Sequence, residues 1–305
     1  MQEFTDLINY CYQQYTAIPP CSDCAMGNCR KNECEDCYNC LKHVHSYSNH
    51  TDHYSCKKIT YNYILKHGHR YASEIEKAIA DIKPYLDRTR PVYILSVGCG
   101  PSTELYGAVQ ALNGMTISYM GIDRNPIWNE IQNFNIDRFG QTPHIVQYTS
   151  EDFFSFIKDR WADILILNYF FSDLIKFSPD ITDDFINKLA DLINNGIFKW
   201  VVINDIPLFY KDGTGYICME HLAQKLSPAI KVARRHFATP NDFQPIYGTK
   251  LPCNLSIPIV EQNVQTFNPF ESKGSIQLHI PADTRSAFPV ISVQSPVSIQ
   301  CCWQS

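Results

Sequence analysis

Two glycines and a later aspartate form a pattern suited to binding a nucleoside. Gly98 and Gly100 follow the apolar run Val92 to Val97, which predicts a buried strand that ends in a glycine turn. Such a turn lets a ligand approach the backbone closely. A second apolar run, residues 116–122, ends in Asp123, whose carboxylate can accept hydrogen bonds from both hydroxyls of a ribose. The third glycine of a G-x-G-x-x-G motif is missing, which disfavours a dinucleotide.

A cysteine- and histidine-rich segment near the amino terminus carries a second kind of chemistry. Its two Cys-x-x-Cys pairs can present adjacent thiolates to one tetrahedral ion, and the other cysteines and histidines can complete a second site. Zinc is favoured, as one or two ions, and an iron–sulfur cluster, which needs four cysteines, is the alternative. The predicted ligands are Cys21, Cys24, Cys29, Cys34, Cys37, Cys40, His43 and Cys56.

The composition indicates a globular protein. The chain has 305 residues, of which 45% are hydrophobic, and this is ample for a packed core. Its net charge of -5 argues against a protein that coats nucleic acid through charge alone. No window approaches the roughly 20 apolar residues that span a bilayer, and the first residues lack the basic start of a secretory signal. We therefore expect a cytoplasmic protein without membrane association.

Helix and strand patterns alternate along the chain, as a doubly wound α/β sheet requires. Glu74 and Glu76 fall among the polar positions of the second predicted helix. The predicted helices span residues 2–16, 59–86, 102–112, 126–134, 182–192 and 219–226, and the predicted strands span residues 92–97, 116–122, 144–148, 162–168 and 199–204. We expect three parts: a metal-binding module with an amino-terminal helix (1–58), an α/β domain (59–280) and a tail (281–305).

The glycine turn, Asp123 and the order of elements resemble the class I S-adenosylmethionine-dependent methyltransferase family over roughly residues 60–280. The resemblance implies a mostly parallel, seven-stranded sheet whose final antiparallel pair is 231–237 and 275–280. It also implies that S-adenosylmethionine lies beside Gly98, Cys99 and Gly100, with its ribose on Asp123 and Arg124 next to it.

The resemblance assigns the adenine and methionine ends of the cofactor to two further segments. After the third predicted strand, Asp152 and Phe153 are expected at adenine by hydrogen bonding and packing, although Asp152 also suits a plain helix cap. On the helix before the first strand, Arg70 and Tyr71 are expected at the methionine carboxylate, with Arg70 as its charge partner. The alternative there is a solvated helix face with core tyrosines.

The segment after the fourth predicted strand is where the family meets the methyl acceptor. Asn168, Tyr169 and Asp173 are the candidates for catalysis, and Asn168 is also expected beside the cofactor. In the amino-methylating branch this segment reads Asn-Pro-Pro-Tyr, of which only Asn168 and the aromatic Phe171 match. The missing prolines put nitrogen methylation of a base in doubt. An aromatic-rich start to a core helix explains the same residues.

These observations predict an S-adenosylmethionine-dependent methyltransferase that acts on a macromolecule. RNA is favoured slightly over protein as the partner, because of the metal module and the aromatic segment after the fourth strand. One alternative is a non-catalytic binding or scaffold protein that has kept the fold. The other is a small-molecule methyltransferase, for which the absence of excess basic charge would be natural.

Overall fold

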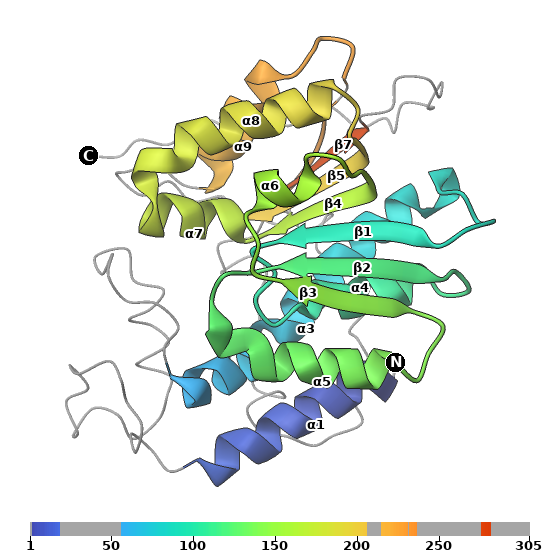
Figure 1. Cartoon of the computed structure of the whole chain (residues 1–305), viewed down its shortest axis with the longest axis vertical. Helices are drawn as coiled ribbons and strands as arrows, with labels where there is room; N and C mark the ends of the chain where they lie inside the picture. The colour runs from blue at the N-terminus through green and yellow to red at the C-terminus, as the bar shows by residue number, and fades with distance from the viewer. Residues whose placement is uncertain (1, 19–55, 206–214, 231, 237–275, 282–305) are drawn as a thin grey trace.

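The computed structural model describes residues 2–18, 56–205, 215–230, 232–236 and 276–281, which form one sheet with helices on both faces (Figure 1). The strands are β1 (Val92–Val97), β2 (Ile117–Ile122), β3 (Ile145–Thr149), β4 (Ala162–Asn168), β5 (Phe198–Asp205), β6 (Ala233–His236) and β7 (Ile276–Pro281). The helices are α1 (Gln2–Ala17), α3 (Lys57–Ile82), α4 (Thr103–Ala111), α5 (Asn129–Phe139), α6 (Phe153–Ile157), α7 (Phe170–Phe177), α8 (Thr182–Asn194) and α9 (Gly215–Lys225). Short 3-10 helices lie at Lys83–Tyr85, Pro126–Trp128 and Pro179–Ile181.

The strands of the sheet follow the order β3-β2-β1-β4-β5-β7-β6. The first five are parallel to one another, which confirms the predicted α/β fold. β7 pairs antiparallel with β5, and β6 pairs antiparallel with β7. The chain winds outward in one direction from β1 and in the other from β4. Ligands of open α/β sheets bind outside the carboxyl ends of the strands at such a switch point.

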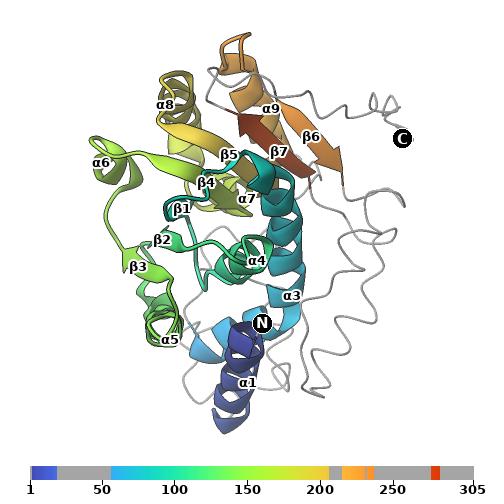
Figure 2. The same ribbon diagram turned by 90° about the vertical axis from the view of Figure 1, so that its right-hand side faces the viewer.

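Successive residues of β4 show how both faces of the sheet are buried. Ile164 and Ile166 pack in the cluster that contains α1, α3, α4 and α5, whereas Leu165 and Leu167 pack in the cluster that contains α6 to α9. Figure 2 shows α3 and α4 together on one side of the sheet. A strand covered on both faces reads as a continuous apolar run, which is why this strand was predictable from sequence.

The amino-terminal helix shares the core of the α/β domain. α1 packs against α3, which in turn packs closely on α4. A Cβ on Gly107 of α4 would lie 2.1 Å from the carbonyl oxygen of Ala72 on α3, so glycine is required at this crossing. The hydroxyls of Tyr10 on α1 and Tyr61 on α3 both donate to Glu130 Oε1 on α5, each at 2.6 Å. Residues 19–55, between α1 and α3, lie outside the described ranges. The predicted boundary between the metal-binding module and the α/β domain at residue 58 therefore stays a prediction.

Most of the predicted metal module lies outside the described residues. Only Cys56 among its predicted ligands is described, and it is a free, partly buried thiol just before α3. Within the described ranges, no group of three or more Cys, His, Asp or Glu side chains is placed to hold a metal ion. Zinc and an iron–sulfur cluster are therefore not supported by the structure. The ligands that lie outside are Cys21, Cys24, Cys29, Cys34, Cys37, Cys40 and His43.

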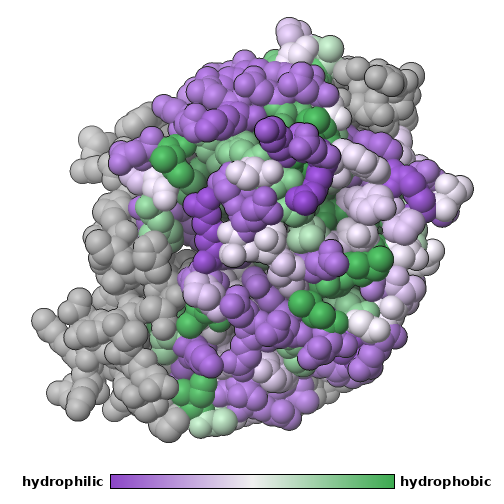
Figure 3. Space-filling view, viewed as in Figure 1, coloured by the Kyte–Doolittle hydropathy of each residue, from purple (hydrophilic) through white to green (hydrophobic). Residues whose placement is uncertain are grey.

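The face of the molecule shown in Figure 3 is mainly polar. On the face in Figure 3, hydrophobic residues form small, separate patches among hydrophilic ones. Of the helices in the described ranges, none is long and apolar enough to cross a membrane. The tail after Pro281 lies outside these ranges.

Candidate functional site

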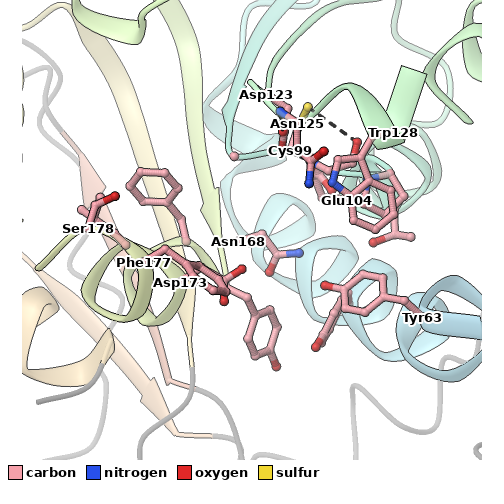
Figure 4. A pocket seen from close by; sticks show the side chains of 18 residues that line it. Tyr63, Cys99, Glu104, Asp123, Asn125, Trp128, Asn168, Asp173, Phe177 and Ser178 are labelled. Carbon is pink, nitrogen blue, oxygen red and sulfur yellow. Dashed lines mark hydrogen bonds between the residues drawn. The ribbon is translucent and has the colours of Figure 1, made fainter. Parts of the chain in front are cut away.

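A cavity of about 240 Å³ opens at the carboxyl ends of β1, β2 and β4, at the switch point between β1 and β4 (Figure 4). Its wall comes from α3, the turn after β1 with the start of α4, the segment after β2, the end of β4, and α7. The predicted residues Gly98, Cys99, Gly100 and Asp123 line it together. Asn168, Tyr169, Asp173 and Tyr71 line it as well. Segments far apart in the sequence thus meet in one site.

The glycine turn after β1 is shaped by neighbouring side chains as well as by its backbone. Gly98 and Gly100 have φ values of +63° and +49°, a region that L side chains rarely adopt. A Cβ on Gly98 would lie 2.5 Å from Phe170 Cδ2, so the space left by this glycine is taken by an aromatic ring that follows β4. Gly98 therefore accommodates the Phe170 ring on the side where a side chain would lie. Gly98 also lines the cavity, and its contact with a cofactor stays a prediction.

Asp123 ties the end of β2 to the glycine turn. Its Oδ2 accepts a hydrogen bond from the Gly100 N–H, and its Oδ1 accepts one from the Asn125 N–H, both at 2.8 Å. Burial raises the pKa of Asp123, while these two hydrogen bonds oppose the rise. A carboxylate oxygen has two lone pairs, so each oxygen can accept one further hydrogen bond. Asp123 can therefore bind a diol without releasing the turn.

Glu104, at the start of α4, is a lining residue that the sequence interpretation missed. Its side chain is 2% exposed, and its Oε1 accepts hydrogen bonds from Ser96 Oγ (2.7 Å) and the Tyr119 hydroxyl (2.8 Å). Burial raises the pKa of Glu104 to about 7, and the hydrogen bonds oppose the rise. The signal in the sequence was that Glu104 is the one charged residue of this mostly apolar helix.

Asn125 and Trp128 were also missed, although both follow Asp123 closely in the sequence. Each lines the cavity, and Figure 4 shows them beside Asp123. The Asn125 side chain accepts a hydrogen bond from the Ile127 N–H and so begins the short 3-10 helix that carries the indole. The signal in the sequence was that Asn125 and Trp128, a polar and an aromatic residue, follow the strand-end Asp123 within one short segment.

A buried polar network holds the segment after β4. Asn204 on β5 donates from Nδ2 both to Asn168 Oδ1 and to Glu74 Oε2, each at 2.8 Å. The Tyr169 hydroxyl donates to the same Glu74 oxygen at 2.9 Å. Tyr169 has a φ of +57°, which is uncommon for a residue with a side chain. Glu74, which the sequence placed among the polar positions of its helix, is fully buried.

Arg70 belongs to this network rather than to the cavity lining. Its Nε donates to Glu74 Oε1 at 2.9 Å, and its guanidinium carbon lies 5.7 Å from the centre of the Tyr169 ring. Tyr71 does line the cavity, and its ring centre is 4.1 Å from that of Tyr169. Burial raises the pKa of Tyr71. A role for Arg70 and Tyr71 at a methionine carboxylate stays a prediction.

Asp173 lies in the first turn of α7, on the cavity wall. Burial raises its pKa to about 7; the nearby carboxyl of Asp205 adds to the rise, and Lys176 opposes it. Asp205 itself accepts a hydrogen bond from the Ser172 N–H at the start of α7 (3.0 Å). Asp173 is therefore poised to gain or lose a proton near neutral pH.

Three further predicted cofactor residues, besides Arg70, lie outside the cavity lining. Arg124 forms an ion pair with Asp152 at 2.6 Å on the surface, where the two side chains are 70% and 46% exposed. Asp152 also accepts from the Ser155 N–H at 3.1 Å, which confirms the helix-cap interpretation for α6. Phe153 is buried and packs in the core near Phe198. Contact of these residues with a cofactor remains a prediction.

Comparisons with known proteins add structural neighbours only. No family model matches the chain, and no curated protein matches it in sequence. The plantazolicin methyltransferase BpumL, solved in complex with SAH, is 14% identical, with a TM-score of 0.45 and coverage of 79% of this chain and 97% of the other.

Two further neighbours also carry methyltransferase names. The METTL16 methyltransferase domain is 13% identical, with a TM-score of 0.39 and coverage of 68% and 66%. Precorrin-6y C5,15-methyltransferase from Geobacter metallireducens GS-15 is 11% identical, with a TM-score of 0.39 and coverage of 68% and 88%. At these values the neighbours say nothing of the substrate of this chain.

Proposed function

We propose that the chain is an S-adenosylmethionine-dependent methyltransferase. The observation that carries the proposal is the hydrogen bond from the Gly100 N–H to the Asp123 carboxylate. This hydrogen bond joins a strand-end acid to a glycine turn at the switch point of a parallel sheet. Both residues line a cavity that also contains Asn168 and Tyr169, from the end of β4. A nucleoside end and an acceptor end thus share one cavity.

The lining fits the chemistry of this cofactor. The free lone pairs of Asp123 suit the two ribose hydroxyls, and the Trp128 indole beside it offers an aromatic surface to adenine. The carboxyl groups of Asp123 and Glu104 line the nucleoside end of the cavity and suit a cationic ligand. When bound, the cofactor supplies a methyl group from a positively charged sulfonium.

The residues after β4 are proposed to orient the acceptor and to exclude water. Methyl transfer is an in-line displacement, so alignment contributes most of the catalysis and a dedicated base is optional. The network of Asn204 and Glu74 fixes Asn168 and Tyr169, which supports an orienting role for both. Asp173 is proposed to hold or accept a proton at its carboxylate.

The class of acceptor rests on weaker support than the cofactor. The expected macromolecular acceptor, RNA before protein, depends on the cysteine-rich segment, which lies outside the described residues. A scaffold that has lost the cofactor site would not bind the cofactor, and a scaffold that has kept the site is separated from an enzyme by turnover alone. A small-molecule acceptor is compatible with the same cavity.

Calorimetric titration with S-adenosylmethionine and S-adenosylhomocysteine tests the proposal. We expect micromolar binding to the full chain, weakened about tenfold to hundredfold by Asp123→Asn, because the amide replaces a charged acceptor. The control is Asp180→Asn, an exposed acid that follows α7 outside the cavity lining, and it should bind as the wild type does. No binding by folded wild type would reject the methyltransferase. Equal affinity in wild type and Asp123→Asn would reject the ribose position.

A further inference from the structure

The cavity has two ends with different side chains. In Figure 4, Cys99, Glu104, Asp123, Asn125 and Trp128 gather at one end, and Asp173, Phe177 and Ser178 lie at the other, with Asn168 between the two groups. The first group is the proposed nucleoside end. On the basis of the proposed function, we infer that the second end binds the acceptor as a protonated amine, held by the Asp173 carboxylate among aromatic rings.

Asp173 offers an unused charged acceptor. Within the described part of the chain, no hydrogen bond or ion pair engages its carboxylate. The charged groups around it are Asp205 on β5, Asp123 after β2 and Lys176 on α7, so acids outnumber bases. An ammonium ion placed here gains a charge-assisted hydrogen bond and relieves the repulsion among the carboxyl groups.

Aromatic rings complete the setting for a cation. Tyr71, Tyr169, Phe170 and Phe177 line the same cavity as Asp173. An ammonium ion is attracted to the face of an aromatic ring, and the attraction is strongest where water is excluded. The Tyr169 hydroxyl is already bound by Glu74, so this ring is fixed in place before any ligand arrives. Carboxylate and rings together favour a cation over a neutral group of the same size.

The same lining opposes an anionic acceptor. Among the described residues that line the cavity, none is Lys, Arg or His. A phosphate or carboxylate at this end would meet Asp173 with no basic side chain on the wall to pair with it. The charge of the lining therefore favours an amine over an RNA backbone at the acceptor end.

The chemistry of an amine acceptor also uses Asp173. An ammonium nitrogen has no free electron pair, so it must first lose a proton, which passes to the Asp173 carboxylate. The neutral nitrogen then forms the new N–C bond while the S–C bond breaks and its electron pair stays on sulfur. The methylated amine leaves as a cation, and Asp173 returns its proton to solvent. A carboxyl with a pKa of about 7 can serve in both directions near neutral pH.

The amine can belong to a small molecule or to a lysine side chain, and the test separates these sources. The full chain is saturated with S-adenosylhomocysteine and titrated in parallel with benzylamine, with its neutral counterpart benzyl alcohol, with a lysine-containing peptide and with the same peptide bearing acetyl-lysine. A short single-stranded RNA is titrated as well. Each titration is repeated with Asp173→Asn and with the control Asp180→Asn, an exposed acid that follows α7 outside the cavity.

We expect benzylamine or the lysine peptide to bind about tenfold or more tightly than its neutral counterpart. Asp173→Asn should remove that preference, Asp180→Asn should keep it, and neither should change the affinity for S-adenosylhomocysteine more than about threefold. Binding of both amines points to an accessible lysine, and binding of benzylamine alone points to a small molecule.

Three results would overturn the inference: equal binding of charged and neutral probes, binding of RNA alone, or a preference that survives Asp173→Asn. Failure of every probe to bind would overturn it too. All of these leave the proposed function standing as long as S-adenosylhomocysteine binds the wild type. A folded wild type that does not bind S-adenosylhomocysteine is the separate result that rejects the proposed methyltransferase function.

Discussion

The contact between Gly98 and Phe170 can be tested with a substitution that adds one methyl group to the turn. Gly98→Ala adds a Cβ at φ +63°, 2.5 Å from Phe170 Cδ2. Gly196→Ala adds one at a similar φ of +70°, with no atom within 4 Å. The left-handed backbone should cost each variant about 1 to 2 kcal/mol. Only Gly98→Ala must also move the ring, which adds about 1 to 3 kcal/mol of overpacking.

The free energy of unfolding, measured in urea, should therefore fall about 1 to 3 kcal/mol further for Gly98→Ala than for Gly196→Ala. Because Gly98 and Phe170 both line the cavity, the affinity for S-adenosylhomocysteine should fall in the first variant alone. Phe170→Ala in the Gly98→Ala background removes the ring that the methyl group meets and should lower the cost of the glycine change. Equal losses of unfolding free energy in the two glycine variants would show that the Phe170 ring moves away without measurable cost and that the contact does not shape the turn.

Two further predictions concern residues of α4. Glu104 has a pKa of about 7 in the folded chain, raised from 4.5, so its contribution to stability is present below about pH 4.5 and declines as the pH rises to about 7. Glu104→Gln should abolish that decline, on the order of 3 kcal/mol, and parallel stability curves from pH 4.5 to 8 for wild type and variant would contradict it. Gly107→Ala places a Cβ 2.1 Å from Ala72 O, so it should destabilise by more than about 3 kcal/mol. Gly68→Ala on α3 meets nothing closer than 3.5 Å and should be neutral or stabilise by up to about 1 kcal/mol; similar melting temperatures for the two variants would argue against this helix crossing.

The parts of the site that were predictable are those written in short stretches of sequence. The run from Val92 to Val97 and the two glycines after it give both a strand and its turn, and Asp123 ends the next strand. Buried parallel strands have continuous apolar runs, so their order along the chain is visible without a structure. The residues placed at the ends of these strands accordingly met in one cavity.

The missed parts depend on contacts between distant segments. Glu74 was placed only among the polar positions of its helix, because a helix of mixed composition does not show which of its polar groups have buried partners. Its partner Asn204 lies 130 residues later, on a strand whose own pattern is apolar. The left-handed conformation of Tyr169 gave no signal either, since glycine or asparagine is the usual residue there. Tertiary hydrogen bonds overrode the local preference.

Three contacts among the described residues shape the cavity, and each of them joins the ends of two strands. Asp123 joins β2 to the turn after β1, Phe170 joins the segment after β4 to the same turn, and Asn204 joins β5 to β4 and, through Glu74, to α3. The turn after β1 thus receives a polar contact from one side and an apolar contact from the other. A ligand that binds Asp123 therefore contacts a residue that holds the same turn as Phe170 does. The nucleoside end and the acceptor end of the cavity are joined through the backbone of Gly98 and Gly100.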